Sequence, residues 1–195
     1  MFLESICIIN GQPQNMEAHL TRMRLTAAQH GFTAPDLPDP LLLLPDHLNS
    51  GKVKWRIEYD EKIVSVEFLP YQPKVIHSLR LVRGNPDYAF KYADRGALEK
   101  LLKLKSSCDE ILIVRNGLIT DTSFSNVLLQ QGDRFFTPAT FLLNGTRRQQ
   151  LLREGIITEK EIPAAELQNY DYILLINAML DINNAPRIPI SNICG

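Results

Sequence analysis

Residues 109–138 read DEILIVRNGLITDTSFSNVLLQQGDRFFTP, and they carry the clearest fold signal in the chain. Two apolar runs, at 111–114 and 127–129, are each followed by a polar turn: Asn-Gly at 116–117 and Gln-Gly-Asp at 131–133. An Asn-Gly pair between apolar runs is a strong signal for a β-hairpin, because these residues tolerate the positive φ of its tight turn. The stretch therefore predicts two successive strand–turn–strand units.

Other segments on both sides add helices and strands, so the fold class predicted is mixed α+β. Residues 15–32 place apolar side chains at three- and four-residue spacings, with Asn15 available to start the helix and Gly31 to end it. Asn144 is a possible cap for a later helix. We expect helices at 15–32, 94–107 and 144–155, and further strands at 2–9, 52–60, 62–70, 74–84 and 170–180.

The composition changes at RGNPDYAF, residues 83–90, which we interpret as a hinge between two halves. The prediction is a shortened N-terminal α/β subdomain at 1–82 and a C-terminal subdomain at 83–195 that carries Lys91.

Composition excludes several classes of function. The chain has 195 residues, a net charge of −1 and no run of five like charges, so we expect no nucleic-acid or membrane partner. Three dispersed cysteines and four scattered histidines predict neither a disulfide framework nor a metal site. The first residues lack a basic leader and no apolar run is long enough to span a bilayer, so we expect a cytoplasmic protein.

Four residues or segments can carry chemistry, and each has an ordinary structural explanation as well. Lys91 has Phe90 and Tyr92 as neighbours, so its amine can be partly desolvated and nucleophilic, or it is a surface lysine before a helix. Asp121 follows a strand and can pair with a ring nitrogen, or it caps a turn. Arg22 can bind an anion or be a solvated helix residue.

The fourth candidate is the Gly145–Thr146 pair at the start of a predicted helix. Free backbone N–H groups and the helix dipole favour an anion at such a position. Glycine is also common at helix starts without any ligand, and the segment lacks the Gly-Lys-Ser/Thr of a nucleotide-binding loop.

Taken together, KYADR (91–95), DEILIVRNGLITDTSFSNVLL (109–129), FFTPAT (135–140) and LLNGTRRQQLL (142–152) resemble the class IV aminotransferase family. These are the fold-type IV pyridoxal 5'-phosphate enzymes, which include branched-chain and D-amino-acid aminotransferases and 4-amino-4-deoxychorismate lyase. The opening LESICIINGQPQNMEAHLTRM (3–23) is similar to the start of that family. The resemblance implies two small α/β subdomains with the cofactor site between them, and a homodimer.

The resemblance also implies a role for each candidate residue. Lys91 would bond to the cofactor aldehyde, and Asp121 would lie opposite the pyridine nitrogen, where the family has a glutamate. The cofactor phosphate would be bound by Arg22 and by the helix start at Gly145, Thr146 and Arg147. Arg95 and Asn126 match recurring family positions that support the structure, and Arg148 matches the arginine that closes the family's G-x-x-R pattern.

Three features depart from the family pattern. Asp121 is shorter than the family glutamate, Ala178 stands where the family usually presents a serine or threonine hydroxyl to the phosphate, and the first half of the chain is short. One interpretation of these departures is a degenerate, non-catalytic family member.

The resemblance favours a lyase that acts on a small amino substrate, converting 4-amino-4-deoxychorismate to 4-aminobenzoate and pyruvate. Ser5 occupies the position of a family threonine linked to the elimination step, so it is a candidate catalytic residue; the alternative is a serine bonded to the backbone. The alternative activity is a class IV aminotransferase for a branched-chain or D-amino acid.

Overall fold

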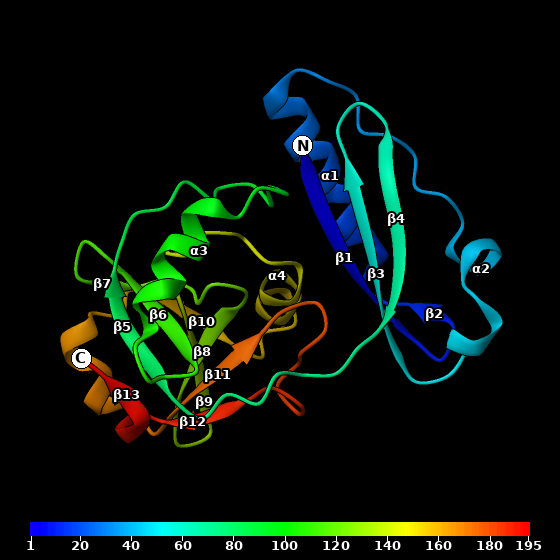
Figure 1. The fold of residues 1–195 in the computed structure, drawn as a ribbon. Helices are drawn as coiled ribbons and strands as arrows, with labels where there is room; N and C mark the ends of the chain where they lie inside the picture. The colour runs from blue at the N-terminus through cyan, green and yellow to red at the C-terminus, as the bar shows by residue number, and fades with distance from the viewer. The chain divides into compact units, whose positions relative to one another are not determined.

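The computed structural model describes all 195 residues and divides them into two compact units. The first unit contains Met1–Pro73 and Phe90–Asp94, and the second contains Lys74–Ala89 and Arg95–Gly195. In Figure 1 the strands of the first unit run from blue to cyan, and those of the second run from green to red. The predicted α+β class is confirmed.

The first unit is a four-stranded antiparallel sheet with the strand order β2-β1-β3-β4. One long helix, α1, contacts β1 (Figure 1). The strands are β1 (Phe2–Ile9), β2 (Gln12–Pro13), β3 (Lys52–Tyr59) and β4 (Ile63–Pro70), and the helices are α1 (Met16–His30), α2 (Pro40–Leu43) and the 3-10 turn η1 (Asp46–Leu48).

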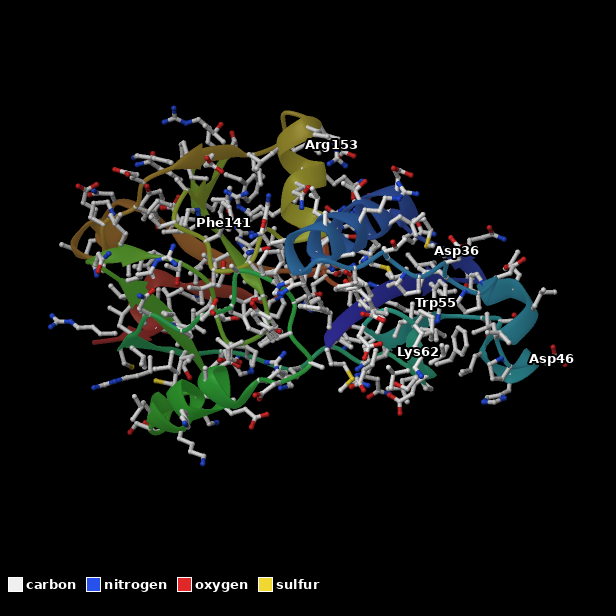
Figure 2. The ribbon with its side chains drawn as sticks, turned by 90° about the horizontal axis from the view of Figure 1, so that it is seen from above. Asp36, Asp46, Trp55, Lys62, Phe141 and Arg153 are labelled. Atoms are coloured by element: carbon white, nitrogen blue, oxygen red, sulfur yellow. The ribbon has the colours of Figure 1, made fainter.

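Alternation along β3 determines which face of this sheet is buried. Val53, Trp55, Ile57 and Tyr59 are at most 1% exposed, whereas the residues between them are partly exposed. Side chains of successive residues point to opposite faces of a sheet, so one face forms the core. The Trp55 ring stacks on Phe68 of β4 at a centroid distance of 5.9 Å, and Trp55 is labelled in Figure 2.

The second unit contains two sheets. The first has the order β13-β5-β6-β7, and the second has the order β10-β9-β8-β11-β12. The first comprises β5 (Leu79–Arg83), β6 (Glu110–Arg115), β7 (Leu118–Ile119) and β13 (Ile193–Cys194). The second comprises β8 (Asn126–Gln131), β9 (Arg134–Pro138), β10 (Thr158–Lys160), β11 (Tyr172–Ile176) and β12 (Arg187–Pro189).

The main core of the second unit lies between these two sheets. Leu79, Leu112 and Ile119 of one sheet share a buried cluster with Val127 and Ile173 of the other. A smaller cluster on the opposite face of the second sheet includes residues of α4 and the segment after it. The helices are α3 (Gly96–Leu102), α4 (Thr146–Arg153) and the 3-10 turns η2 (Lys103–Lys105), η3 (Ala164–Asn169) and η4 (Ile190–Asn192).

Most predicted elements are present with shifted ends. The Asn-Gly turn between β6 and β7 is confirmed, since Asn116 and Gly117 have φ values of 53° and 81°. Gly31 ends α1 with a φ of 76°. Asn15 stands at the N-cap of α1, but its side chain makes no capping hydrogen bond. The predicted cap Asn144 is one residue too early, because Gly145 is the N-cap of α4.

The division of the chain differs from the predicted boundary after residue 82. β5 pairs in parallel with β6 from Leu79 to Arg83, so this strand belongs to the second unit, and the boundary falls after Pro73. Lys91, predicted in the second half, lies with the first unit, because residues 90–94 return to the edge of β1. No helix is long and apolar enough to cross a membrane.

A buried ion pair joins α1 to the sheet in the first unit. Glu4 of β1 is 0% exposed, and the Arg22 side chain donates from Nε to Glu4 Oε1 at 2.8 Å and from Nη2 to Oε2 at 2.6 Å. The Nδ1 atom of buried His19 lies 2.6 Å from the same Oε2. Because a carboxylate only accepts hydrogen bonds, His19 donates through Nδ1.

Electrostatics fix the charges of this cluster. Burial alone would raise the pKa of Glu4, but Arg22 and His19 outweigh burial and hold it well below its usual range. Burial lowers the pKa of His19, more strongly than Glu4 raises it. The cluster therefore consists of an ionised Glu4, a cationic Arg22 and a neutral His19 at neutral pH.

Substituting Glu4→Gln removes the anion and leaves the Arg22 guanidinium without its charge partner. We expect this variant to lose about 3–5 kcal/mol of unfolding free energy at pH 7, because a buried cation is left unpaired. Urea denaturation measures the loss. Glu17→Gln on the same helix is the matched control, since its pair with Arg24 is largely exposed, and it is expected to leave the midpoint unchanged.

The pH dependence of this difference has a defined sign. The folded-state pKa of Glu4 lies below its value of 4.5 in the unfolded chain, so its contribution is complete above about pH 5 and is lost as the pH falls. The gap between wild type and Glu4→Gln should be constant from pH 8 to about 5 and shrink in more acidic solution. A gap that widens on acidification would contradict an ionised Glu4.

Candidate cofactor site

Lys91 is held against the free edge of β1 in the first unit. Phe2 and Tyr92 form an antiparallel β-bridge, the Leu3 N–H donates to the Lys91 carbonyl at 2.9 Å, and the Ala93 N–H donates to the Met1 carbonyl at 3.2 Å. These bonds make the residues around Lys91 a short added strand. The position of the lysine therefore depends on the backbone of β1.

The backbone turns tightly at Lys91, because the Tyr92 N–H donates to the Phe90 carbonyl at 2.9 Å. The Lys91 side chain is half-buried, and its charge acts to lower the pKa of His19. Ser5 is half-buried and opposes Arg56 of β3. Lys91 and Ser5 therefore both belong to the first unit, one on the segment added to β1 and the other on β1 itself.

The aromatic neighbours of Lys91 anchor its segment. Phe90 and Tyr92 pack with Phe2 in one cluster, and the Phe2 and Tyr92 ring centroids are 5.6 Å apart. These ring contacts add to the backbone hydrogen bonds that hold the segment against β1.

Arg22 lies on the opposite face of the sheet from Ser5, because it binds Glu4. Its guanidinium is 11% exposed and bonds both Glu4 oxygens, so its orientation is fixed by the carboxylate. Two donors on one edge of the fork are committed to Glu4 in this way. Nothing in the local sequence pattern indicates that Glu4 is buried, so the residue that orients Arg22 was not predicted.

Asp121 is the buried acid of the second unit. Its Oδ1 accepts from Asn126 Nδ2 at 2.8 Å, and its Oδ2 accepts from the backbone N–H groups of Leu142 and Leu143 at 2.9 and 3.0 Å. Burial raises the pKa of Asp121 to about 6, although these donors and Arg148 act to lower it. Asp121 therefore joins the end of the β7 segment to the loop before α4.

The predicted phosphate-binding residues form the first turn of α4. Gly145 is the N-cap, with no side-chain cap, and Thr146 is 2% exposed. The first N–H groups of a helix have no acceptor inside the helix, which makes this end suitable for an anion. Arg147 donates from Nη1 to Gln150 at 3.0 Å, while its Nε is buried and has no hydrogen-bond partner.

Arg148 holds the same turn from its other side. Its guanidinium donates to Asn144 Oδ1 at 3.2 Å and to the Pro138 carbonyl at 3.0 Å, pairs with Glu159, and stacks 4.2 Å from the Phe141 ring centroid. Figure 2 labels Phe141 in the loop before α4, and Arg153 at the end of the helix. These contacts make Arg148 a structural residue of the second unit.

A further network, absent from the sequence-based prediction, supports the loop after Asp121. The Arg95 guanidinium donates to the Ser123 carbonyl at 2.7 Å, and the Ser123 hydroxyl donates to buried Glu110 at 2.9 Å. Arg95 therefore supports local structure, as expected. Glu110 was not identified because a single acid at the start of a strand does not differ in sequence from a solvated one.

The donors present fit pyridoxal phosphate. An aldehyde requires an amine, and the first unit has one in Lys91. A phosphate requires cations and N–H donors; the first unit has a cation in Arg22, and the second unit has N–H donors at the start of α4. The unpaired, buried Nε of Arg147 is a further donor at the helix start. Ala178 brings no hydroxyl, and the chain has no group of three or more His, Cys, Asp or Glu side chains arranged to hold a metal ion.

Comparisons with known proteins identify relatives of the whole chain. The sequence model of the family "Amino-transferase class IV" matches residues 1–188. An uncharacterised protein of Haemophilus influenzae is 34% identical over 180 residues, which make up 90% of this chain and 96% of that protein. The compact first half is therefore shared with this relative.

Solved structures show the same fold. A candidate 4-amino-4-deoxychorismate lyase from Haemophilus somnus is 34% identical with a TM-score of 0.80, over 91% of this chain and 95% of the other. A candidate amino-acid aminotransferase from Mesorhizobium loti is 22% identical with a TM-score of 0.76, over 96% and 97%. An aminotransferase-like protein of Mycobacterium tuberculosis, solved with pyridoxal phosphate bound, is 17% identical with a TM-score of 0.73, over 96% and 79%.

The last two similarities concern the fold alone. The family match covers almost the whole chain, and two relatives at 34% identity align over nine-tenths of it. The chain belongs to the class IV aminotransferase family, whose members are enzymes that use pyridoxal phosphate as their cofactor.

Proposed function

We propose that this enzyme is a pyridoxal-phosphate-dependent lyase that converts 4-amino-4-deoxychorismate to 4-aminobenzoate and pyruvate. The observation that carries the proposal is the 34% identity, over 91% of the chain, with a candidate lyase of this specificity. The presence of a serine hydroxyl and a lysine amine in the first unit, at Ser5 and Lys91, supports it, because elimination needs a proton donor as well as a base. Family membership favours a catalytic protein over a non-catalytic relative.

Different residues of the chain would bind the cofactor and transfer protons. Lys91 would hold the cofactor aldehyde, Arg22 and the α4 turn from Gly145 to Arg147 would bind its phosphate, and Asp121 is the acid that the family resemblance assigns to the pyridine end. When bound, the cofactor would supply an electron sink for the substrate carbon that bears the amine. Once the substrate amine has displaced Lys91 from the aldehyde, the freed Lys91 Nζ would take the proton from that carbon, and the Ser5 hydroxyl would pass a proton to the departing pyruvate.

The driving force for elimination lies in the substrate, because loss of pyruvate produces an aromatic ring. An aminotransferase for a branched-chain or D-amino acid is the alternative, since the same family and the same lysine serve both reactions. The residues placed here do not include a ligand for the substrate carboxylates. We also expect a cytoplasmic homodimer, a prediction from sequence and family resemblance.

Replacing Lys91 with alanine tests the assignment of the reactive amine. With added pyridoxal phosphate, borohydride should fix the cofactor on Lys91 in the wild-type protein, as peptide mass spectrometry detects, and Lys91→Ala should take up no label. Activity should fall by about a thousandfold or more, because the base and the covalent anchor are lost together. Lys100→Ala is the control, because Lys100 is an exposed lysine of α3, nine residues further along the chain. This variant should retain both the label on Lys91 and the activity.

The products distinguish the lyase from the aminotransferase. Wild-type protein incubated with 4-amino-4-deoxychorismate should release 4-aminobenzoate and pyruvate in equal amounts, without any keto acid. Faster amine transfer from a branched-chain or D-amino acid to a keto acid, with no 4-aminobenzoate formed, would establish the alternative activity.

Ser5 is tested by a pair of substitutions. Ser5→Ala removes the hydroxyl and should lower the turnover number by about 10²–10⁴-fold, the range of a lost general acid, while the affinity for the cofactor is unchanged. Ser5→Thr keeps a hydroxyl and should stay within about an order of magnitude of wild type. Equal turnover by Ser5→Ala and wild type would assign Ser5 a structural role only.

A further inference from the structure

The loop that leads into α4 is held by two buried polar side chains from one neighbouring segment. Asp121 receives the backbone N–H groups of Leu142 and Leu143, at 2.9 and 3.0 Å, on a single oxygen. Asn126 donates from one Nδ2 both to the other Asp121 oxygen, at 2.8 Å, and to the Leu143 carbonyl, at 2.9 Å. Both polar backbone groups of Leu143 are thus fixed.

Gly145, the N-cap of α4, lies directly against the same asparagine. A Cβ atom at Gly145 would be 2.0 Å from Asn126 Oδ1, far closer than atoms can approach. The backbone at the start of α4 therefore packs directly against the Asn126 side-chain amide. The backbone of Gly145 has φ −67° and ψ 144°, which any residue can adopt. Glycine is required here by close packing and not by backbone conformation.

The Asp121 carboxylate is largely committed to these contacts. It has about four lone-pair positions for hydrogen bonds, and Asn126, Leu142 and Leu143 occupy three of them. Asp121 and Asn126 are 5% and 6% exposed, so water does not compete for these donors. With these partners the carboxylate holds the loop before α4 in place, and the position of the loop determines the position of the first turn of α4.

We propose that Asp121 and Asn126 are positioning residues that hold the Leu142–Gly145 loop so that the first turn of α4 is in place to bind the cofactor phosphate. This inference rests on the function proposed above. It assigns Asp121 a task at the phosphate end of the cofactor, whereas the family resemblance assigns it to the pyridine nitrogen. A small displacement of the loop would misdirect several N–H donors at once, which makes the phosphate the sensitive part of the ligand.

Comparing pyridoxal phosphate with pyridoxal separates the two tasks, because pyridoxal keeps the ring nitrogen and the aldehyde but has no phosphate. The dissociation constants of both compounds are measured by absorbance in buffer free of phosphate and sulfate, for wild type, Gly145→Ala, Asp121→Asn and Asn126→Ala. Asn183→Ala, an exposed asparagine of the same unit, is the control and should leave both constants unchanged.

We expect the three loop variants to bind pyridoxal phosphate about tenfold or more weakly, the effect of losing a hydrogen bond to a charged group, while pyridoxal binding changes by less than about threefold. Competition by inorganic phosphate against pyridoxal phosphate should weaken in parallel. Equal losses for both compounds in Asp121→Asn, or an unchanged preference for the phosphorylated compound in Gly145→Ala, would overturn the inference.

Gly145→Ala keeps every charge and hydrogen-bonding side chain, so it decides the question even where Asp121→Asn or Asn126→Ala fails to fold; circular dichroism identifies such failures. The wild-type protein tests the underlying function separately. If it binds neither compound, the proposed function fails together with the inference. If it prefers pyridoxal phosphate and the loop variants keep that preference, only the inference fails.

Discussion

A carboxylate buried away from water must be given hydrogen-bond donors, and each unit of this protein is organised around one such group. In the first unit, Glu4 receives two donors from Arg22 and one from His19, and these join the long helix to the sheet. In the second unit, Asp121 receives an amide and two backbone N–H groups, which attach a loop to the strand segment before it. Each acid fixes the group assigned to the cofactor phosphate in its own unit.

Glu4 and Asp121 have different hydrogen-bond donors, and their pKa values are shifted in opposite directions as a result. Glu4 is paired with a full positive charge, which outweighs burial and lowers its pKa. Asp121 has mainly neutral donors, so burial prevails and its pKa rises to about 6. The first unit thus keeps its ion pair over a wide pH range, whereas the charge at Asp121 is retained at neutral pH by a smaller margin.

The fold was predictable where a local pattern determines the structure. Alternation identified the β3–β4 hairpin, and the Asn-Gly pair identified the turn at 116–117. The boundary between the units was not predictable from a shift in composition, because it depends on the parallel pairing of β5 with β6. β10, β12 and β13 were missed, since each has two or three residues and no apolar alternation long enough to detect.

For the site, the sequence supplied the residue types and the family pattern, but not the contacts that orient them. Lys91 was chosen partly for its aromatic neighbours, but the sequence did not show that Phe90 and Tyr92 pack against Phe2 and anchor the segment to β1. Glu4 and Glu110 were overlooked as buried acids, because burial depends on what packs over a strand and not on the strand's own residues. A family motif therefore predicts which groups take part, while their orientation comes from partners that are distant in the sequence.

The aspartate at position 121 illustrates how the length of a side chain selects a role. The family pattern has a glutamate there, and one more methylene would carry the carboxylate past the backbone N–H groups that Asp121 now reaches at 2.9 and 3.0 Å. The shorter acid suits a loop that lies close to its own strand, and Asn126 closes the remaining side. An acid at this position that bonds the loop before α4 can influence a phosphate at the start of that helix through the position of the loop, which is the role we propose for Asp121.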